Sequence, residues 1–319
     1  MSRLWSNKMK QFSIVNLLHV FVLFLITTAV FGVYILLAIQ NHFPQIEPII
    51  NGTEARPYVY RVLPSFIVMI ISTTFGISPY LSSIIMMYIS LIGFSFTILV
   101  LARLFLPASH VRSITLFAPI GLLPFLIYQR KIYDFPILFI FTLALYYLAK
   151  NNLVKYILIF AIATLTKETS IFLLIFFLLQ FRNIGSKNII FWGILQIFIY
   201  SVIRLGVIYL FRNNSGTIIE SHLKEHLNTY LQFPELAMIL FFILLTTAGT
   251  ILLKTQDNTN FLRNSLIAIG SPTFILYLLS GMPFEIRVFL EAYPSAFLLI
   301  ALIATGFIWG TPNIKEAAT

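Results

Sequence analysis

Four short clusters of charged residues interrupt a chain that is otherwise strongly apolar. They lie at or near the ends of apolar runs, within residues 54–61, 130–134, 167–168 and 285–291. Ionisable groups beside membrane segments are costly to keep there, so they are candidates for function. Carboxylates can accept a proton from a reacting hydroxyl, and arginine or lysine can bind a phosphate. If the four clusters meet on one face of a membrane, they form a polar chamber.

The composition indicates an integral membrane protein. Hydrophobic residues make up 59% and charged residues 10% of the 319 positions, against about 45–50% and about 25% in soluble domains. The chain contains no cysteine, which excludes disulfides and thiolate metal sites. Its net charge of +10 comes from basic residues scattered between apolar runs. This pattern is typical of membrane orientation, so we expect membrane lipid and no nucleic acid as a partner.

The apolar runs predict a single all-α polytopic membrane domain over residues 1–319, with about ten transmembrane helices and no soluble domain. Crossing a bilayer core of about 30 Å takes about 20 helical residues. The runs cover residues 12–39, 58–77, 81–106, 114–128, 135–149, 156–166, 170–181, 189–211, 236–253, 262–280 and 290–310. The first run is too long for a signal peptide, so we expect it to be a transmembrane helix.

The lysines and arginines set the expected orientation, because these residues are enriched in cytoplasmic loops. If residues 58–77 form a juxtamembrane helix on the outer surface, most of them lie inside and both termini are cytoplasmic. If that segment spans the membrane, the lysines and arginines are nearly balanced between the two faces. We therefore prefer the topology with the juxtamembrane helix. It predicts an outer loop and juxtamembrane helix over residues 40–80 and a second large outer loop over 212–235. All four charged clusters then lie outside.

Residues 155–182 are expected to form a hairpin of two short helices. Basic residues stand at both ends of the segment, and Lys167 and Glu168 lie at its middle. Each arm would measure about 17–21 Å at about 1.5 Å per residue, so the tip would stop within the membrane. Ions there are tolerated only when they are paired or line a wet cavity.

Each cluster also has an ordinary structural explanation. Asp134 could cap a helix N-terminus, and Lys167 could form a salt bridge with Glu168 at the hairpin tip. Arg287 and Glu291 are four residues apart and could pair along one helix face.

One further string in the second outer loop fits the H-x-x-E-H pattern of some zinc peptidases. It reads His222-Leu-Lys-Glu225-His226, with no other evident ligand nearby. We interpret it as the polar face of a surface helix, and we assign no metal ligand.

The order of these parts resembles the polytopic membrane glycosyltransferases of the GT-C class, such as lipid A aminoarabinose transferase and the protein O-mannosyltransferases. The resemblance covers residues 1–185 well and the remainder loosely. It depends on an outward first helix, a loop with Arg56-Pro-Tyr-Val-Tyr-Arg-Val-Leu-Pro64, a helix start at Tyr133-Asp134-Phe-Pro136, and a hairpin tip with Thr166-Lys167-Glu168-Thr169. Similar Tyr-Arg-x-Leu-x-Pro and Lys/Arg-Glu-Thr strings occur in bacterial membrane proteins of cell-surface polysaccharide formation.

The resemblance implies transfer of a sugar from a polyprenyl-phosphate donor to a lipid, polysaccharide or protein acceptor. The reaction would take place on the outer face of a bacterial plasma membrane. The family usually carries an aspartate in its first outer loop, whereas residues 41–60 contain none. The base would therefore be Asp134, Glu54 or Glu47, and the phosphate would be bound by Lys167, Arg56, Arg61 and Arg287.

Supporting roles would fall to the residues beside these candidates, namely Tyr58, Tyr60, Arg130, Lys131, Glu168, Glu285 and Glu291. The resemblance assigns no cofactor beyond the lipid-linked sugar itself, and it leaves a divalent-metal requirement open. Two other functions remain alternatives. One is a transporter or flippase of a lipid-linked sugar or small anion, and the other is a polysaccharide polymerase or ligase.

Overall fold

The computed structural model describes residues 2–40, 46–126, 131–181, 187–217, 221–233 and 259–309, and its regular elements in these ranges are all helical. The first part contains α1 (Ser2–Gln40), α2 (Glu47–Ile50), the 3-10 turn η1 (Tyr58–Tyr60), α3 (Val62–Phe75), α4 (Pro79–Ala102), α5 (Ala108–Ile120) and the 3-10 turn η2 (Leu123–Leu126). The middle contains α6 (Asp134–Ala149), α7 (Leu153–Thr166), the 3-10 turn η3 (Glu168–Ser170), α8 (Ile171–Phe181) and α9 (Lys187–Leu210). The last part contains α10 (Leu223–Gln232), α12 (Asn260–Ser265), the π-helical turn η5 (Leu266–Gly270), α13 (Ser271–Ser280), the 3-10 turn η6 (Ile286–Glu291) and α14 (Tyr293–Trp309).

Five helices in the described ranges are long and apolar enough to cross a membrane. They cover Leu17–Ala38, Pro79–Ala102, Ala108–Leu126, Ile189–Leu210 and Asn260–Ser280. Five shorter apolar helices cover Val62–Phe75, Asp134–Ala149, Leu153–Thr166, Glu168–Phe181 and Tyr293–Gly306. The predicted all-α membrane class is confirmed, whereas the number of ten spans and the cytoplasmic termini stay predictions. The predicted run 236–253 lies outside the described residues.

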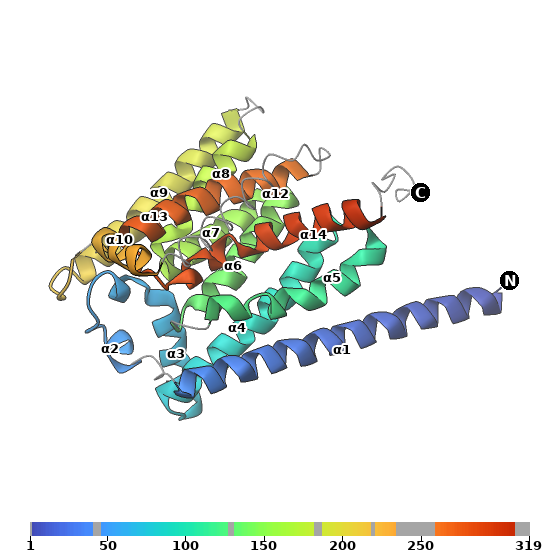
Figure 1. The fold of residues 1–319 in the computed structure, drawn as a ribbon, viewed down its shortest axis with the longest axis horizontal. Coiled ribbons are helices and arrows are strands. Elements are labelled where there is room, and N and C mark those ends of the chain that lie inside the picture. Colours follow the sequence, from blue (N-terminus) through green and yellow to red (C-terminus); the bar gives the residue numbers. More distant parts are fainter. Residues whose placement is uncertain are drawn as a thin grey trace.

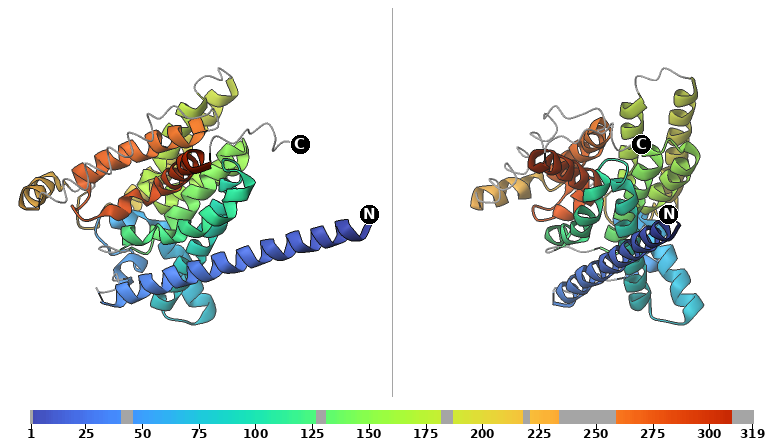
Figure 2. Two further views of the ribbon diagram at one scale, coloured as in Figure 1. Left: turned by 45° about the vertical axis from the view of Figure 1, so that its right-hand side comes forward. Right: turned by 90° about the vertical axis from the view of Figure 1, so that its right-hand side faces the viewer.

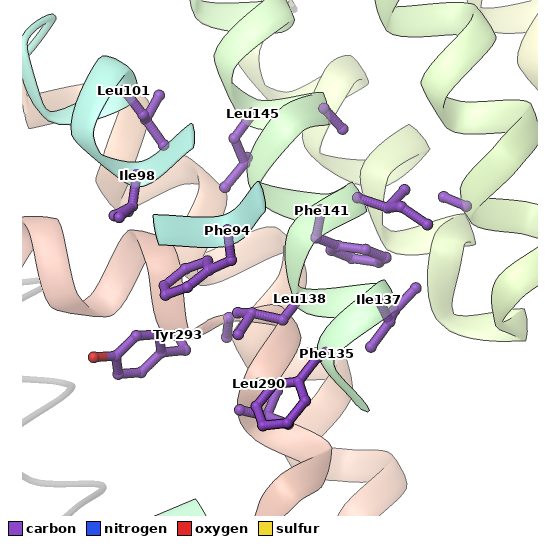
Figure 3. Packing of buried hydrophobic residues seen from close by; sticks show 14 of the residues in the cluster. Phe94, Ile98, Leu101, Phe135, Ile137, Leu138, Phe141, Leu145, Leu290 and Tyr293 are labelled. Atoms are coloured by element: carbon purple, nitrogen blue, oxygen red, sulfur yellow. The ribbon is translucent and has the colours of Figure 1, made fainter. Parts of the chain in front are cut away.

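The bundle is organised around α4 and α6, which pack along each other more extensively than any other pair of described helices. Phe94 of α4 lies beside Leu138 of α6, and Leu290 and Tyr293 complete the same buried cluster (Figure 3). In lipid, close packing of this kind drives helix association, because lipid tails are as apolar as the side chains. The cluster adjoins the first turn of α6 and so positions Asp134.

One end of the bundle collects the elements that do not span it. The elements α2, α3 and α10 lie at the left of Figure 1, whereas the start of α1 and the end of α14 lie at the right. Helix α3 runs at a steep angle to α1 (Figures 1 and 2). The apolar side chains of Phe66, Met69 and Phe75 on this helix are exposed. Helix α3 is apolar on most of its surface, and its juxtamembrane position stays a prediction.

Helix α1 is the longest element and reaches past its neighbours. Its 39 residues measure about 58 Å at about 1.5 Å per residue, which exceeds the full thickness of a bilayer of about 40–45 Å. Its N-terminal turns accordingly project beyond the other helices (Figure 2). The apolar part that can lie in lipid is Leu17–Ala38.

The predicted hairpin forms. The Tyr156 hydroxyl near the start of α7 donates to the carbonyl of Leu173 in α8 at 2.8 Å, and its ring stacks on Phe177 at 6.0 Å between centroids. These contacts link the two helices on either side of the break. The helix breaks at Lys167, whose backbone is extended at φ −160° and ψ 146°.

Cysteine labelling tests which end of the bundle faces outward, since the chain has no cysteine of its own. We expect a membrane-impermeant thiol reagent on intact cells to label Thr53→Cys and Met282→Cys. It should not label Ser109→Cys, in the first turn of α5 at the opposite end. All three positions are exposed, so labelling depends on the side of the membrane on which each position lies. Labelling of Ser109→Cys alone would reverse the orientation.

Candidate functional site

Asp134 and Arg287 form a buried ion pair where α6 begins. Asp134 Oδ1 accepts a hydrogen bond from Arg287 Nη1 at 2.9 Å, and Oδ2 accepts one from the backbone N–H of Lys131 at 2.8 Å. The second amino group of Arg287 donates to Glu285. The two paired residues are only 2% and 4% exposed. Asp134 does not cap α6, because the amide that it bonds belongs to Lys131, which precedes the helix. Its carboxylate fixes the preceding turn and balances a buried arginine.

Arg61 and Glu168 form a second pair on the other side of Tyr133. Arg61 Nη2 donates to Glu168 Oε1 at 2.7 Å, and Nε donates to Oε2 at 3.4 Å. The guanidinium carbons of Arg61 and Arg287 lie 4.2 and 5.6 Å from the centre of the Tyr133 ring. Both cations are therefore attracted to the same ring. Tyr133 joins the two ion pairs into one network.

Lys167 and Glu291 form a third pair, which joins the hairpin tip to the segment before α14. Lys167 Nζ donates to Glu291 Oε1, and both residues are buried. The other carboxylate oxygen, Oε2, is buried without a hydrogen-bond partner among the described residues. The four sequence clusters therefore meet at one end of the bundle.

Two predicted pairings are wrong, for local geometric reasons. Lys167 does not bond its neighbour Glu168, because the backbone between them is extended and successive side chains of an extended backbone point in opposite directions. Arg287 does not pair with Glu291, because η6 is a 3-10 helix. In that helix residues three apart share a face, and residues four apart do not.

Arg204 is a buried cation that our reading of the sequence did not select. It lies within α9, 8% exposed, with its guanidinium carbon 5.5 Å from the centre of the Tyr60 ring. One turn earlier, the hydroxyl of Tyr200 donates to the carbonyl of Glu168 at 3.0 Å. The signal was available in the sequence, since Arg204 is a charge well inside the apolar run 189–211.

Lys131 and Arg204 differ from the other cations of the network. Neither forms an ion pair with a carboxylate in the part of the chain that the structure describes. Lys131 Nζ lies 4.9 Å from the centre of the Tyr58 ring. Burial lowers the pKa of Lys131, and the nearby charge of Arg287 lowers this pKa further. Among the described cations of the network, these two are the ones without a carboxylate partner. Arg204 Nη1 donates to the backbone carbonyl of Tyr60 at 3.5 Å.

Arg56 holds two loops together and does not join the network. Its guanidinium donates to the backbone carbonyls of Gly216 at 2.6 Å and Arg212 at 3.4 Å. Gly216 has φ +88°, and a Cβ at this position would stand 2.5 Å from the carbonyl oxygen of Arg56, so the contact requires glycine. Asn214 adds side-chain bonds to the carbonyls of Gly52 and Glu54.

The two glutamates of the first loop are placed differently. Glu54 is half-buried and lies close enough to Lys131 to act on its charge. Glu47 is exposed in the first turn of α2. Tyr58 and Tyr60 present their rings to the cations Arg61 and Arg204. Arg130 lies outside the described residues.

The H-x-x-E-H string does not form a metal site. His222 Nδ1 bonds Glu225 at 2.8 Å at the surface, whereas His226 is buried. His226 Nε2 bonds the carbonyls of Tyr277 and Gly281 at 2.9 and 2.8 Å, so this nitrogen carries a proton and has no lone pair for a metal. The interpretation as a solvated polar face is therefore wrong for His226, which docks α10 on the end of α13.

Comparisons with protein-family models, with curated proteins and with solved structures found no match for this chain. The chemistry of the ion network and of the polar groups around it is therefore the basis for assigning a function. Its three paired cations face four carboxylates, those of Glu168, Glu291, Asp134 and Glu285, and Lys131 and Arg204 have no carboxylate partner among the described residues.

Breaking one buried pair should destabilise the protein strongly. We expect Lys167→Met to cost about 3–5 kcal/mol, because it leaves Glu291 charged and unpaired. The double variant Lys167→Met with Glu291→Met should recover most of this loss, since it removes both ions. Lys155→Met, at an exposed lysine of the same helix, is the control. Thermal unfolding in detergent measures the effect, and a double variant no more stable than the single one would contradict it.

The two histidines of α10 should differ in the same assay. His226→Leu is expected to cost about 1–3 kcal/mol, because it removes the donor to two buried carbonyls. His222→Leu breaks only a surface pair and should cost less than about 1 kcal/mol. A chelator such as EDTA should leave the unfolding temperature of the unmodified protein unchanged. A chelator-induced loss of stability would argue for a metal after all.

Proposed function

We propose that this protein transfers a sugar from a polyprenyl-phosphate donor to a hydroxyl acceptor on the extracytoplasmic face of a membrane. The main support is the meeting of the four charged clusters at the end of the bundle that carries the apolar helix α3. A departing phosphate needs cations with donors still available, and a reacting hydroxyl needs a carboxylate base. Both kinds of group remain once the paired ions are set aside.

The phosphate role belongs to Lys131 and Arg204 in this proposal. Lys167, the first candidate from the sequence, is engaged with Glu291, and Arg56 is engaged with loop carbonyls. Arg61 and Arg287 are paired but add positive potential around Tyr133. Burial lowers the pKa of Lys131 because it disfavours the charged ammonium form. An anionic partner nearby would favour that charged form again.

Glu54 is the base in this proposal. Both oxygens of Asp134 are already bonded, and the residue is buried. Glu54 has its backbone fixed by bonds to Pro48 and Asn214, while its carboxylate lies near Lys131. As the acceptor oxygen attacks the anomeric carbon, its proton passes to Glu54. The bond from that carbon to the phosphate oxygen breaks, and the phosphate leaves on the cations.

Glu54→Gln should lower the rate of sugar transfer by about 10²–10⁴-fold, the usual contribution of a positioned base. The assay is loss of radiolabelled sugar from a polyprenyl-phosphate sugar by the full-length protein in liposomes. Glu225→Gln, at an exposed glutamate of α10, is the matched control and should keep the rate. Normal turnover by Glu54→Gln, together with loss in a folded Asp134→Asn variant, would move the base to Asp134.

The alternatives give different results in the same liposomes. A transporter or flippase would move the labelled lipid between leaflets without releasing the sugar. A polymerase or ligase would consume only pyrophosphate-linked donors. Either outcome would replace the proposed transfer from a monophosphate donor.

A further inference from the structure

A cavity of about 350 Å³ opens beside the ion network. It lies where η3 and α8 meet α9 and α13, which are close together in Figure 1. Phe172, Pro272 and Ile275 contribute to its apolar walls, and Glu168, Thr169 and Tyr200 form its polar end. Neither the three ion pairs nor the groups assigned to the sugar transfer account for this space.

The cavity continues into surfaces suited to lipid. Ile175 of α8, Ile197 of α9 and Leu279 of α13 are all exposed apolar side chains on the helices that surround it. Two of these helices belong to the segments long enough to span a membrane, where such side chains contact acyl chains. A ligand entering here comes from the bilayer, so it carries an apolar chain.

The polar end fits a neutral hydroxyl group. Thr169 Oγ1 is buried and has no hydrogen-bond partner within the described ranges. The Glu168 side chain is 30% exposed although Arg61 binds it, so its carboxylate can accept a further bond. A hydroxyl both donates and accepts and can satisfy the two groups together. The remaining lone pairs of the Glu168 carboxylate call for a donor, which a hydroxyl has and an ionised phosphate lacks.

We infer that this cavity binds a single-chain membrane lipid through a neutral head that carries a hydroxyl. The hydroxyl donates to Glu168 and accepts from Thr169, and the chain runs out between α8 and α13 into the bilayer. The volume is near the lower limit of small-molecule sites, about 300–1,000 Å³, so it holds the head and the start of one chain. This inference goes beyond the proposed function, because the bound hydroxyl donates to Glu168 and not to the proposed base Glu54.

Photolabelling of the full-length protein in lipid nanodiscs tests the site directly. The probes are a diazirine-bearing hexadecanol and its phosphate monoester. We expect the alcohol to crosslink to peptides of α8 and α13, and the phosphate ester to label them less. Thr169→Val should raise the half-saturating concentration of the alcohol about 2- to 10-fold, as expected for one lost hydrogen bond. Thr169→Ser should restore binding, which separates the hydroxyl from a packing effect.

A second pair of variants tests the apolar walls. Ile275→Trp should reduce labelling by filling the cavity, whereas Ile300→Trp, at an exposed position of α14, should not. Equal labelling by the phosphate ester, or labelling unchanged by Thr169→Val and Ile275→Trp, would overturn the inference. Photolabelling needs no sugar donor, so the two proposals fail separately. Labelling without sugar release would support the lipid site and contradict the proposed sugar transfer. Sugar release without labelling would overturn the lipid site and leave the proposed transfer intact.

Discussion

A charged side chain inside an apolar bundle must find its counter-ion within the protein, and this requirement organises the end of the molecule that carries the candidate site. The pairs Arg61 with Glu168, Lys167 with Glu291 and Arg287 with Asp134 join residues 107, 124 and 153 positions apart. Each pair connects the end of one helical element to another. Removing one partner leaves an uncompensated buried charge, so each pair fixes the relative position of the elements that it joins.

The local backbone makes these pairings possible. The extended residue at the hairpin tip sends Lys167 and Glu168 in opposite directions, so one hairpin contacts two distant partners. The 3-10 geometry of η6 separates Arg287 from Glu291 in the same way and directs them to different carboxylate and ammonium groups. Breaks in regular helix therefore distribute the charges of two short sequence clusters over the whole network.

The contrast between satisfied and unsatisfied polar groups separates structural from functional roles. Most buried polar groups in proteins have a hydrogen-bond partner, and those without one call for an explanation. Here the paired ions have an evident structural role. Lys131 and Arg204 have no carboxylate partner among the described residues, and the buried Thr169 hydroxyl, without a hydrogen-bond partner there, belongs to a residue that lines the cavity. In the proposed function, an anionic donor would bind Lys131 and Arg204.

The sequence by itself determined the all-α membrane class, the hairpin break at Lys167 and the four charged clusters, because hydropathy and helix breaks are local properties. It located α10 within residues 212–235, and the apolar helix α3 within residues 58–77. Only the tertiary structure decided the partners of the ions, the loop contact of Arg56 and the docking of His226 on α13. The physical reason is that these contacts join residues tens to more than a hundred positions apart. The packing of the helices brings them together, and no pattern within a single segment specifies it.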